Sequence, residues 1–409
     1  MTMNSCGLRR LFLAFAAALG VASGVLGHSP LWGAEAAGRP AIRIGHIAHL
    51  TGVYAAEGKD EVDGARLAFE ETRYSVGGRL IQHIVEDDEA NPPLTLSKAR
   101  KLVEADRVHA LMGIIWSPSA LAIRDYVHGR QVPTVFSGSA VRELTQERRS
   151  PYIFRASFAA GQDQVPFGRY VYQVLGYRRA IVFGFDSPFG REQGAFFRKG
   201  FEEAGGRVIQ ELYAPIATAD FAPFLARLRV GEADVVWAIW SAAAAVRFVK
   251  QWQDLGFKDR IALVGFQGLI DSRVLEAVGA AAEGIVAGYW YWPEVDTIGN
   301  RRFARMFREK YGREPSIYAV QGYLPARVLV EALKLVGARV EDREEFVKAI
   351  RRVRFDAPPG RFRFDEFNNP VWNIYMARVT LEGGKPVRRI IGVVHSVEQI
   401  WPAGKPASR

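Results

Sequence analysis

Apolar residues along this chain alternate between a spacing typical of strands and a spacing typical of helices. In residues 42–71, a β-branched run leads into a small polar loop with Thr51, Gly52, Tyr54 and Gly58, and apolar residues then recur at helical spacing. This unit predicts a strand, a loop and a helix. Such a loop lies at the carboxyl end of a parallel strand, which is where open α/β sheets bind ligands.

The same design returns in residues 180–203, which predict a strand, a polar loop with Gly190 and a helix. A glutamate pair follows the loop glycine at the same distance in both copies, Glu70–Glu71 after Gly58 and Glu202–Glu203 after Gly190. Two related α/β halves that face one another would form a cleft between their loops.

The alternation continues to about Gly288 and predicts two lobes, each a parallel sheet covered by helices. Strands of the first lobe are expected at 42–48, 80–86, 109–115, 132–136 and 152–155, with helices at 60–73, 95–106 and 119–129. Strands of the second lobe are expected at 180–185, 208–213, 234–240, 261–266 and 284–289, with helices at 163–175, 191–204, 221–229, 242–255 and 272–278. Beyond Pro293 the pattern predicts helices at 301–311, 318–336 and 343–352 and antiparallel strands at 361–365, 373–380 and 387–395. The pattern alone does not assign this tail to either lobe.

Residues 1–36 have the features of a secretory leader. Arg9–Arg10 precede an uncharged run at 11–26, and Ala34-Glu35-Ala36 provides a small-x-small cleavage signal. The run is shorter than the ~20 residues that a membrane span needs, so a cleaved leader is favoured over a retained anchor. Cys6, the only cysteine, precedes the run, whereas a lipid-anchoring cysteine would follow it. We therefore expect a mature, unlipidated periplasmic protein; the sequence leaves open whether export uses the twin-arginine or the general route.

Length and charge limit the remaining classes. The 409 residues, 49% hydrophobic and 24% charged, suffice for two well-buried domains. The net charge of +10 is spread over scattered arginines with no nucleic-acid-binding motif, so no nucleic-acid partner is expected. Nucleotide-binding glycine loops, GxSxG and HExxH patterns are absent from the sequence, and we expect neither an enzyme nor a cofactor.

Two clusters resemble metal sites but do not predict one. His46 and His49 are three residues apart on or just after a strand, so their side chains face opposite sides. Asp87-Asp88-Glu89 precedes Asn91-Pro92-Pro93 and is better explained as a polar strand exit before a helix. No metal is expected.

A set of segments, in the right order, resembles the leucine/isoleucine/valine-binding-protein-like solute receptors of ABC importers. The segments are LTGVYAAEG (50–58), GARLAFEE (64–71), VEDDEANP (85–92), VPTVFSGSA (132–140), PYIFRAS (151–157), FDSPFGR (185–191), AAEGIVAG (281–288) and KYGREPSIYA (310–319). The resemblance covers nearly all of the chain after the leader. It implies an α/β fold of two doubly wound parallel-sheet lobes joined by three hinge crossings, with the chain leaving the second lobe near Tyr289 and returning near Arg361. The first lobe would be 37–156 plus 290–360, and the second 157–289 plus 361–409.

Candidate ligand-binding residues of the first lobe follow its strands. Ser117, after Trp116, can cap the next helix, and a helix start also favours a carboxylate. Ser137, Gly138, Ser139 and Ala140 combine small size with hydroxyl groups, although a plain turn has the same composition. The resemblance implies that Ser117 holds a ligand carboxylate and that position 140 often carries threonine in relatives.

Further candidates come from the second lobe and the tail. The resemblance implies that Phe189 and Tyr318 match aromatic residues of the pocket, and we expect Trp116 to act with them. Trp240, followed by Ser241, ends a strand where a cleft residue is expected, although an aromatic side chain there could belong to the core. Relatives that bind amino acids carry an acid at the position of Gln267, which pairs with the ligand's ammonium group. Glu57 could supply that charge instead; we expect it to pair with Lys59 in solvent.

Together these residues predict a non-catalytic, monomeric receptor that closes around one small molecule. The expected ligand is a branched-chain amino acid or a related carboxylate, aromatic acids included, delivered to the membrane permease subunits of an ABC importer. The alternative is a sensor module of the same fold for an amide or urea-like ligand. The sequence specifies neither the ligand nor the permease.

Overall fold

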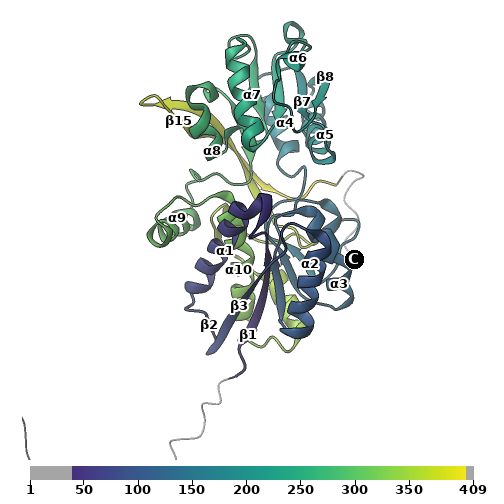
Figure 1. The fold of residues 1–409 in the computed structure, drawn as a ribbon, viewed down its shortest axis with the longest axis vertical. Helices are drawn as coiled ribbons and strands as arrows, with labels where there is room; N and C mark the ends of the chain where they lie inside the picture. The colour runs from purple at the N-terminus through teal and green to yellow at the C-terminus, as the bar shows by residue number, and fades with distance from the viewer. Residues whose placement is uncertain (1–38, 402–409) are drawn as a thin grey trace, which may run out of the picture. The chain divides into compact units, whose positions relative to one another are not determined.

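The computed structural model describes residues 39–401 (Figure 1). The expected leader at 1–36, with Cys6, and residues 402–409 lie outside the described residues. Within 39–401, no helix is both long and apolar enough to cross a membrane.

The first sheet has the order β2-β3-β1-β4-β5-β6, and all neighbouring strands except the short β2 are parallel. Its strands are β1 (Ile42–Ala48), β2 (Ser75–Val76), β3 (Arg79–Asp87), β4 (Ala110–Gly113), β5 (Thr134–Phe136) and β6 (Ile153–Arg155). The helices of this lobe are α1 (Ala55–Glu70), α2 (Pro92–Arg100), α3 (Ser117–Gly129), α9 (Ile298–Tyr311), α10 (Ile317–Leu335) and α11 (Arg343–Arg352). Figure 1 shows α1 and α10 on one side of β1 and β3, and α2 and α3 on the other.

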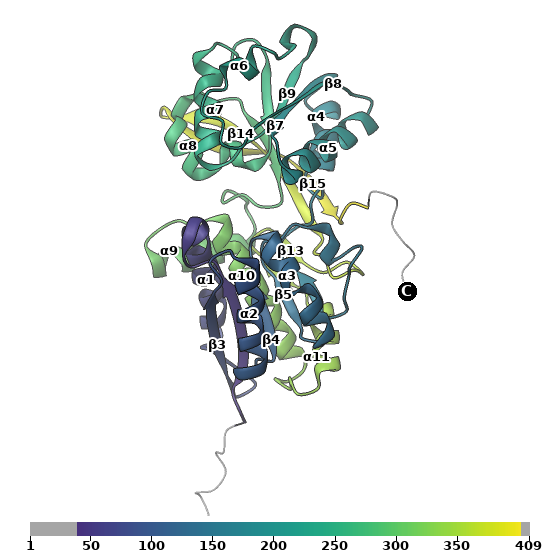
Figure 2. The same ribbon diagram turned by 45° about the vertical axis from the view of Figure 1, so that its right-hand side comes forward.

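The second sheet has the order β15-β14-β11-β10-β9-β7-β8. Its strands are β7 (Arg179–Phe185), β8 (Arg207–Ala214), β9 (Val235–Ile239), β10 (Ala262–Gly265), β11 (Val286–Tyr289), β14 (Trp372–Glu382) and β15 (Lys385–Val397). The helices of this lobe are α4 (Gln164–Gln173), α5 (Pro188–Glu203), α6 (Ala222–Leu225), α7 (Ala242–Asp254) and α8 (Ser272–Val278). Figure 2 shows α4 and α5 packed together beside β7 and β9, with α7 and α8 on the other side.

This architecture confirms the expected fold of two α/β lobes. The chain enters the second lobe after β6, leaves it after β11, and returns at β14, which pairs antiparallel with β11. The predicted strands and helices of the two lobes are present within a few residues, because buried Val-, Ile- and Ala-rich strands alternate with amphipathic helices. The exception is the helix expected at 221–229, of which only the short α6 forms. The two predicted tail strands at 373–380 and 387–395 belong to the second sheet as β14 and β15.

The predicted strand at 361–365 is wrong in extent and placement. The chain forms a separate hairpin of β12 (Phe355–Ala357) and β13 (Gly360–Phe362) outside both main sheets. The following segment contacts the first lobe, since the Phe364 ring lies 5.3 Å from Phe154 and Arg155 N donates to Asn368 O at 3.0 Å. These contacts favour a return to the second lobe near Trp372 rather than Arg361, and the domain boundaries stay a proposal.

Helices α1 and α10 cross at close range because glycine occupies the contact on each. A methyl group at Gly64 would overlap the carbonyl of Ala319, and one at Gly322 would overlap the carbonyl of Glu61. This crossing fixes the two segments that carry Glu57 and Tyr318 next to one another. The helix packing therefore positions part of the candidate site.

Helix α1 also begins earlier than predicted, at Ala55 rather than Asp60. Glu57 and Gly58 consequently lie in its first turn and not in a loop. A side chain at Gly58 would overlap the backbone of His49, so the glycine is required by the passage of the helix over the end of β1.

Candidate functional site

Loops after β1, β4 and β5 bring four predicted residues together in the first lobe. The rings of Tyr54 and Trp116 lie 6.2 Å apart, and Ser139 Oγ donates to Ser117 Oγ at 3.2 Å. Ser139 is buried, whereas Ser117 and Trp116 are partly exposed. The accessible hydroxyl at this position is therefore that of Ser117.

Ser117 does not cap α3, contrary to one of its two predicted roles. Helix α3 starts at Ser117 itself, Trp116 is the N-cap residue, and no side chain makes a capping hydrogen bond there. Ser117 accepts a hydrogen bond from Ser139, so its own hydroxyl hydrogen can be donated to another group. This hydroxyl lies at the N-terminus of α3, a position that favours negative charge.

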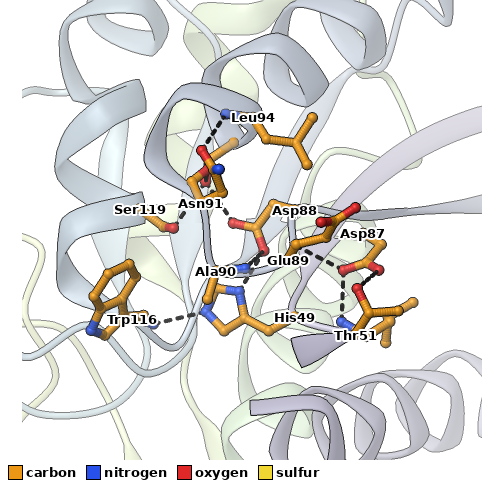
Figure 3. Close-up of polar contacts among 12 residues, drawn as sticks. His49, Thr51, Asp87, Asp88, Glu89, Ala90, Asn91, Leu94, Trp116 and Ser119 are labelled. Atoms are coloured by element: carbon orange, nitrogen blue, oxygen red, sulfur yellow. Dashed lines mark hydrogen bonds and ion pairs between the residues drawn. The ribbon is translucent and has the colours of Figure 1, made fainter. Parts of the chain in front are cut away.

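The turn before Trp116 is strained and held by buried groups. Ile114 has a φ of 68°, in the left-handed region that β-branched residues rarely adopt. Its N–H donates to Ile47 O at 3.0 Å, and the N–H of Trp116 donates to His49 Nε2 at 3.3 Å (Figure 3). Strain of this kind is typical of functional sites, where the surrounding structure holds it in place.

His49 is a site residue that the sequence reasoning missed. Its Nδ1 contacts Asp88, which also accepts from Thr95 Oγ1 at 2.6 Å (Figure 3). Because Nε2 accepts the Trp116 N–H, Nδ1 carries the proton and donates to Asp88. Burial alone would lower the pKa of His49, but the hydrogen bond and charge of Asp88 raise it above its ordinary value.

The two histidines considered as a metal pair have separate partners. His46 Nδ1 contacts His83 Nε2 at 3.0 Å, away from the His49–Asp88 pair. Asp87 ends β3 and accepts from Leu50 N at 2.8 Å and Thr51 Oγ1 at 2.7 Å, which confirms the polar strand exit.

Three residues of the loop at 137–140 have structural roles. Ser137 is fully buried and donates to the Glu61 carboxylate rather than facing the cleft. Gly138 leaves no room for a side chain, since a Cβ would lie 2.8 Å from Gln321 Oε1 and from Ile115 Cα. Ala140 is also buried, and its carbonyl accepts from Ala160 N at 2.9 Å.

Replacing Ser137 and Ser117 in turn separates the structural role of Ser137 from the expected binding role of Ser117. Ser137→Ala is expected to lower the free energy of unfolding by about 1–3 kcal/mol, because it removes the donor to a buried carboxylate, with little change in affinity. Ser117→Ala is expected to weaken carboxylate binding by roughly 1 kcal/mol or more with little change in stability. Urea unfolding and calorimetric titration of both variants measure the pair of effects, and the reversed pattern would contradict this assignment.

The second lobe offers an aromatic wall after β7 and β10. The partly exposed Phe189 stacks 6.5 Å from Phe185 and lies edge-on to Phe266 at 5.7 Å. Trp240 does not join this wall: it is fully buried, with its ring 4.7 Å from Phe221 and 5.4 Å from Phe183. Trp240 therefore belongs to the core and does not contact the cleft.

A cavity of about 540 Å³ contains four further predicted residues. Glu57 and Tyr318 reach it from α1 and α10, and Ser241 and Gln267 from the loops after β9 and β10. Its other polar lining residues include Asp60, Asp271, Arg273, Arg313, Glu314, Ser316 and Arg388. The volume falls in the range of small-molecule sites.

The ionised side chains of this cavity have partners in its lining or beside it. Arg273 lies 3.6 Å from Glu57 and 3.8 Å from Asp60, and Arg313 lies 2.7 Å from Asp60. Glu57 thus pairs with Arg273 and not, as expected, with Lys59. Asp271 caps α8 by accepting from Arg273 N at 3.1 Å, Glu314 pairs with Arg308, and Arg388 pairs with Glu294.

Tyr318 lines the cavity, whereas Tyr54, Trp116, Ser117 and Phe189 do not. Burial raises the pKa of its phenol, and Glu57, Asp271 and Tyr54 lie close enough to raise it further. The hydroxyl therefore stays protonated at neutral pH and can donate a hydrogen bond to a ligand.

A family model described as periplasmic binding protein matches residues 41–385. A Leu/Ile/Val-binding protein homolog 6 from Brucella melitensis is 27% identical over 352 residues, 85% of this chain and 89% of that protein. An ABC transporter substrate-binding protein structure from Sphaerobacter thermophilus is 36% identical with a TM-score of 0.85, covering 88% of this chain and 99% of that one. An ABC transporter solute-binding protein structure from R. palustris, in complex with benzoate, is 28% identical with a TM-score of 0.76, covering 88% and 98%.

Proposed function

The chain belongs to the periplasmic binding protein family, and from this premise we propose that it closes around one small carboxylate and delivers it to the membrane permease of an ABC importer. It acts as a monomer without catalysis, after removal of residues 1–36 in the periplasm. The carboxylate binds at Ser117 and the start of α3, and the aromatic rings of Tyr54, Trp116 and Phe189 enclose the rest of the ligand.

The pairing of charges in the cavity supports an aromatic acid over a free amino acid. An ammonium group needs an acidic partner, and the carboxylates that line the described cavity already have partners. Gln267, at the position where relatives carry an acid, offers only a neutral acceptor. A benzoate-type acid satisfies this site without leaving a buried ammonium group unpaired, and the similar R. palustris structure holds benzoate.

Binding is coupled to closure of the two lobes. Ser117 and Trp116 lie on the first lobe, and Phe189 and Gln267 on the second, so a ligand that touches both favours the closed state. Open and closed states need to differ by only a few kcal/mol for this shift.

A thermal-shift screen of residues 37–409 tests the proposal. We expect benzoate and hydroxybenzoates at about 100 times their dissociation constants to stabilise the protein by about 2.7 kcal/mol. Leucine, isoleucine, valine, phenylalanine, benzamide and urea are the comparison set. A response confined to the amino acids would reassign the ligand within the same role, a response confined to the amides would favour the sensor alternative, and no response to any carboxylate would overturn the proposal.

A further inference from the structure

Arg155, the last residue of β6, is a buried cation directly behind the loop that carries Ser139. Its side chain is fully buried, and the described residues include no carboxylate in ion-pair contact with it. Burial lowers the pKa of Arg155 to about 9, while the nearby Asp365 raises it, so the side chain stays protonated at neutral pH. A buried charge is costly unless it is paired and hydrogen-bonded.

The guanidinium group of Arg155 holds this loop through hydrogen bonds to the loop's backbone carbonyl groups. Nε donates to Ser139 O at 2.8 Å, and Nη2 donates to Val141 O. The peptide between Ser139 and Ala140 is trans, so the Ala140 N–H points in the opposite direction from Arg155. No described group accepts a hydrogen bond from that N–H.

The loop in turn orients the accessible hydroxyl. Ser139 Oγ donates to Ser117 Oγ, which leaves the Ser117 hydrogen available to a ligand. Glu61 accepts a hydrogen bond from Ser137 Oγ and none from Ser139. Hydrogen bonds therefore connect Arg155 through Ser139 to the Ser117 hydroxyl.

Arg155 also connects this loop to the segments that cross between the lobes. Nη1 donates to Thr145 Oγ1 at 2.9 Å and to Asn369 Oδ1 at 2.7 Å. Asn369 donates to Gln162 Oε1 at 3.1 Å, and Gln162 donates to Val397 O at 2.8 Å. Residues 139–145 and Asn369 therefore fix the cation directly, and Gln162 holds Asn369 in turn.

We propose that Arg155 is a positioning residue whose buried charge, acting through the Ser139–Ala140 peptide and the Ser117 hydroxyl, makes the site select an anionic carboxylate over its neutral amide. The proposal rests on the proposed function and assigns the anion preference to a residue that does not touch the ligand. A unit charge several ångströms behind the site contributes about tenfold or more to anion binding at the effective dielectric of a protein.

The test compares benzoate with benzamide, or leucine with leucinamide if the screen selects amino acids, by calorimetric titration or displacement. Arg155→Gln keeps a donor but removes the charge, and is expected to weaken the carboxylate at least about tenfold more than the amide. Arg155→Lys, measured near pH 5 so that a buried lysine keeps its proton, is expected to preserve the ratio of carboxylate to amide affinity even where both affinities fall.

Arg351→Gln is the control, because the exposed Arg351 donates to Asn368 Oδ1 at 2.9 Å in the same region without contacting the loop. The ratio of carboxylate affinity to amide affinity in Arg351→Gln is expected to equal that of the wild type. The proposal would be overturned if Arg155→Gln weakened the affinity for carboxylate and amide equally, or if Arg155→Lys also lost the preference for the carboxylate. Either result would leave Arg155 a structural residue. If the wild-type protein bound no carboxylate, the proposed function itself would be contradicted.

Discussion

Gly322→Ala is expected to lower the free energy of unfolding by about 3 kcal/mol or more. The added methyl group would overlap the carbonyl of Glu61, a backbone atom that cannot rotate away, so α1 and α10 must move apart. Overpacking of a tight core typically costs about 1–3 kcal/mol, and a backbone clash belongs at the upper end or beyond. Urea unfolding followed by far-UV circular dichroism measures the loss.

Gly129→Ala is the control, because Gly129 ends α3 and a methyl group added there would have no neighbour within 4 Å. We expect that substitution to be neutral or slightly stabilising, since alanine is the better helix former. Ligand affinity of Gly322→Ala should also fall, because the crossing positions Glu57 and Tyr318. Full stability in Gly322→Ala would mean that the two helices separate easily and do not fix the site.

The sequence predicted the sheets well because each strand is a local property of the chain. The run Ile42–Ala48 lies between Pro40 and the polar loop that begins at Thr51, and it appears unchanged as β1. The start of α1 was harder, since Thr51, Gly52 and Gly58 are typical of loops. Gly58 is in fact required by the contact of the helix with His49, which is a tertiary constraint without a local pattern.

The candidate site was predicted less completely, because side-chain direction and distant partners decide it. Ser137 and Ser139 are alike in sequence, yet one donates to Glu61 and the other to Ser117. Glu57 pairs with Arg273, far along the chain, and not with the adjacent Lys59. Arg155 stood within a recognised family segment, but its contacts with the ligand loop depend on the packing of β6.

Gln267→Glu is expected to shift the preference for an amino acid over the matching acid without an amine by about 10- to 100-fold. A charge-assisted hydrogen bond to an ammonium group is worth roughly 1.5–3 kcal/mol, and glutamine cannot supply it. Arg273, Arg313 and Arg388 already pair with Glu57, Asp60 and Glu294, so they leave the new carboxylate free to meet the ligand. Titration with phenylalanine and 3-phenylpropanoate gives the ratio directly.

Gln253→Glu makes the same charge change at an exposed position of α7 outside the cavity. The ratio of amino-acid affinity to simple-acid affinity should stay at the wild-type value in Gln253→Glu. This control separates the effect of a contact within the site from the general effect of an added negative charge. If Gln267→Glu also leaves the ratio unchanged, Gln267 does not face the ligand's amine position, and the neutral side chain there cannot explain a preference for acids without an amine. A shift confined to Gln267→Glu would instead show that a single neutral amide is what turns an amino-acid site into a site for simple carboxylates.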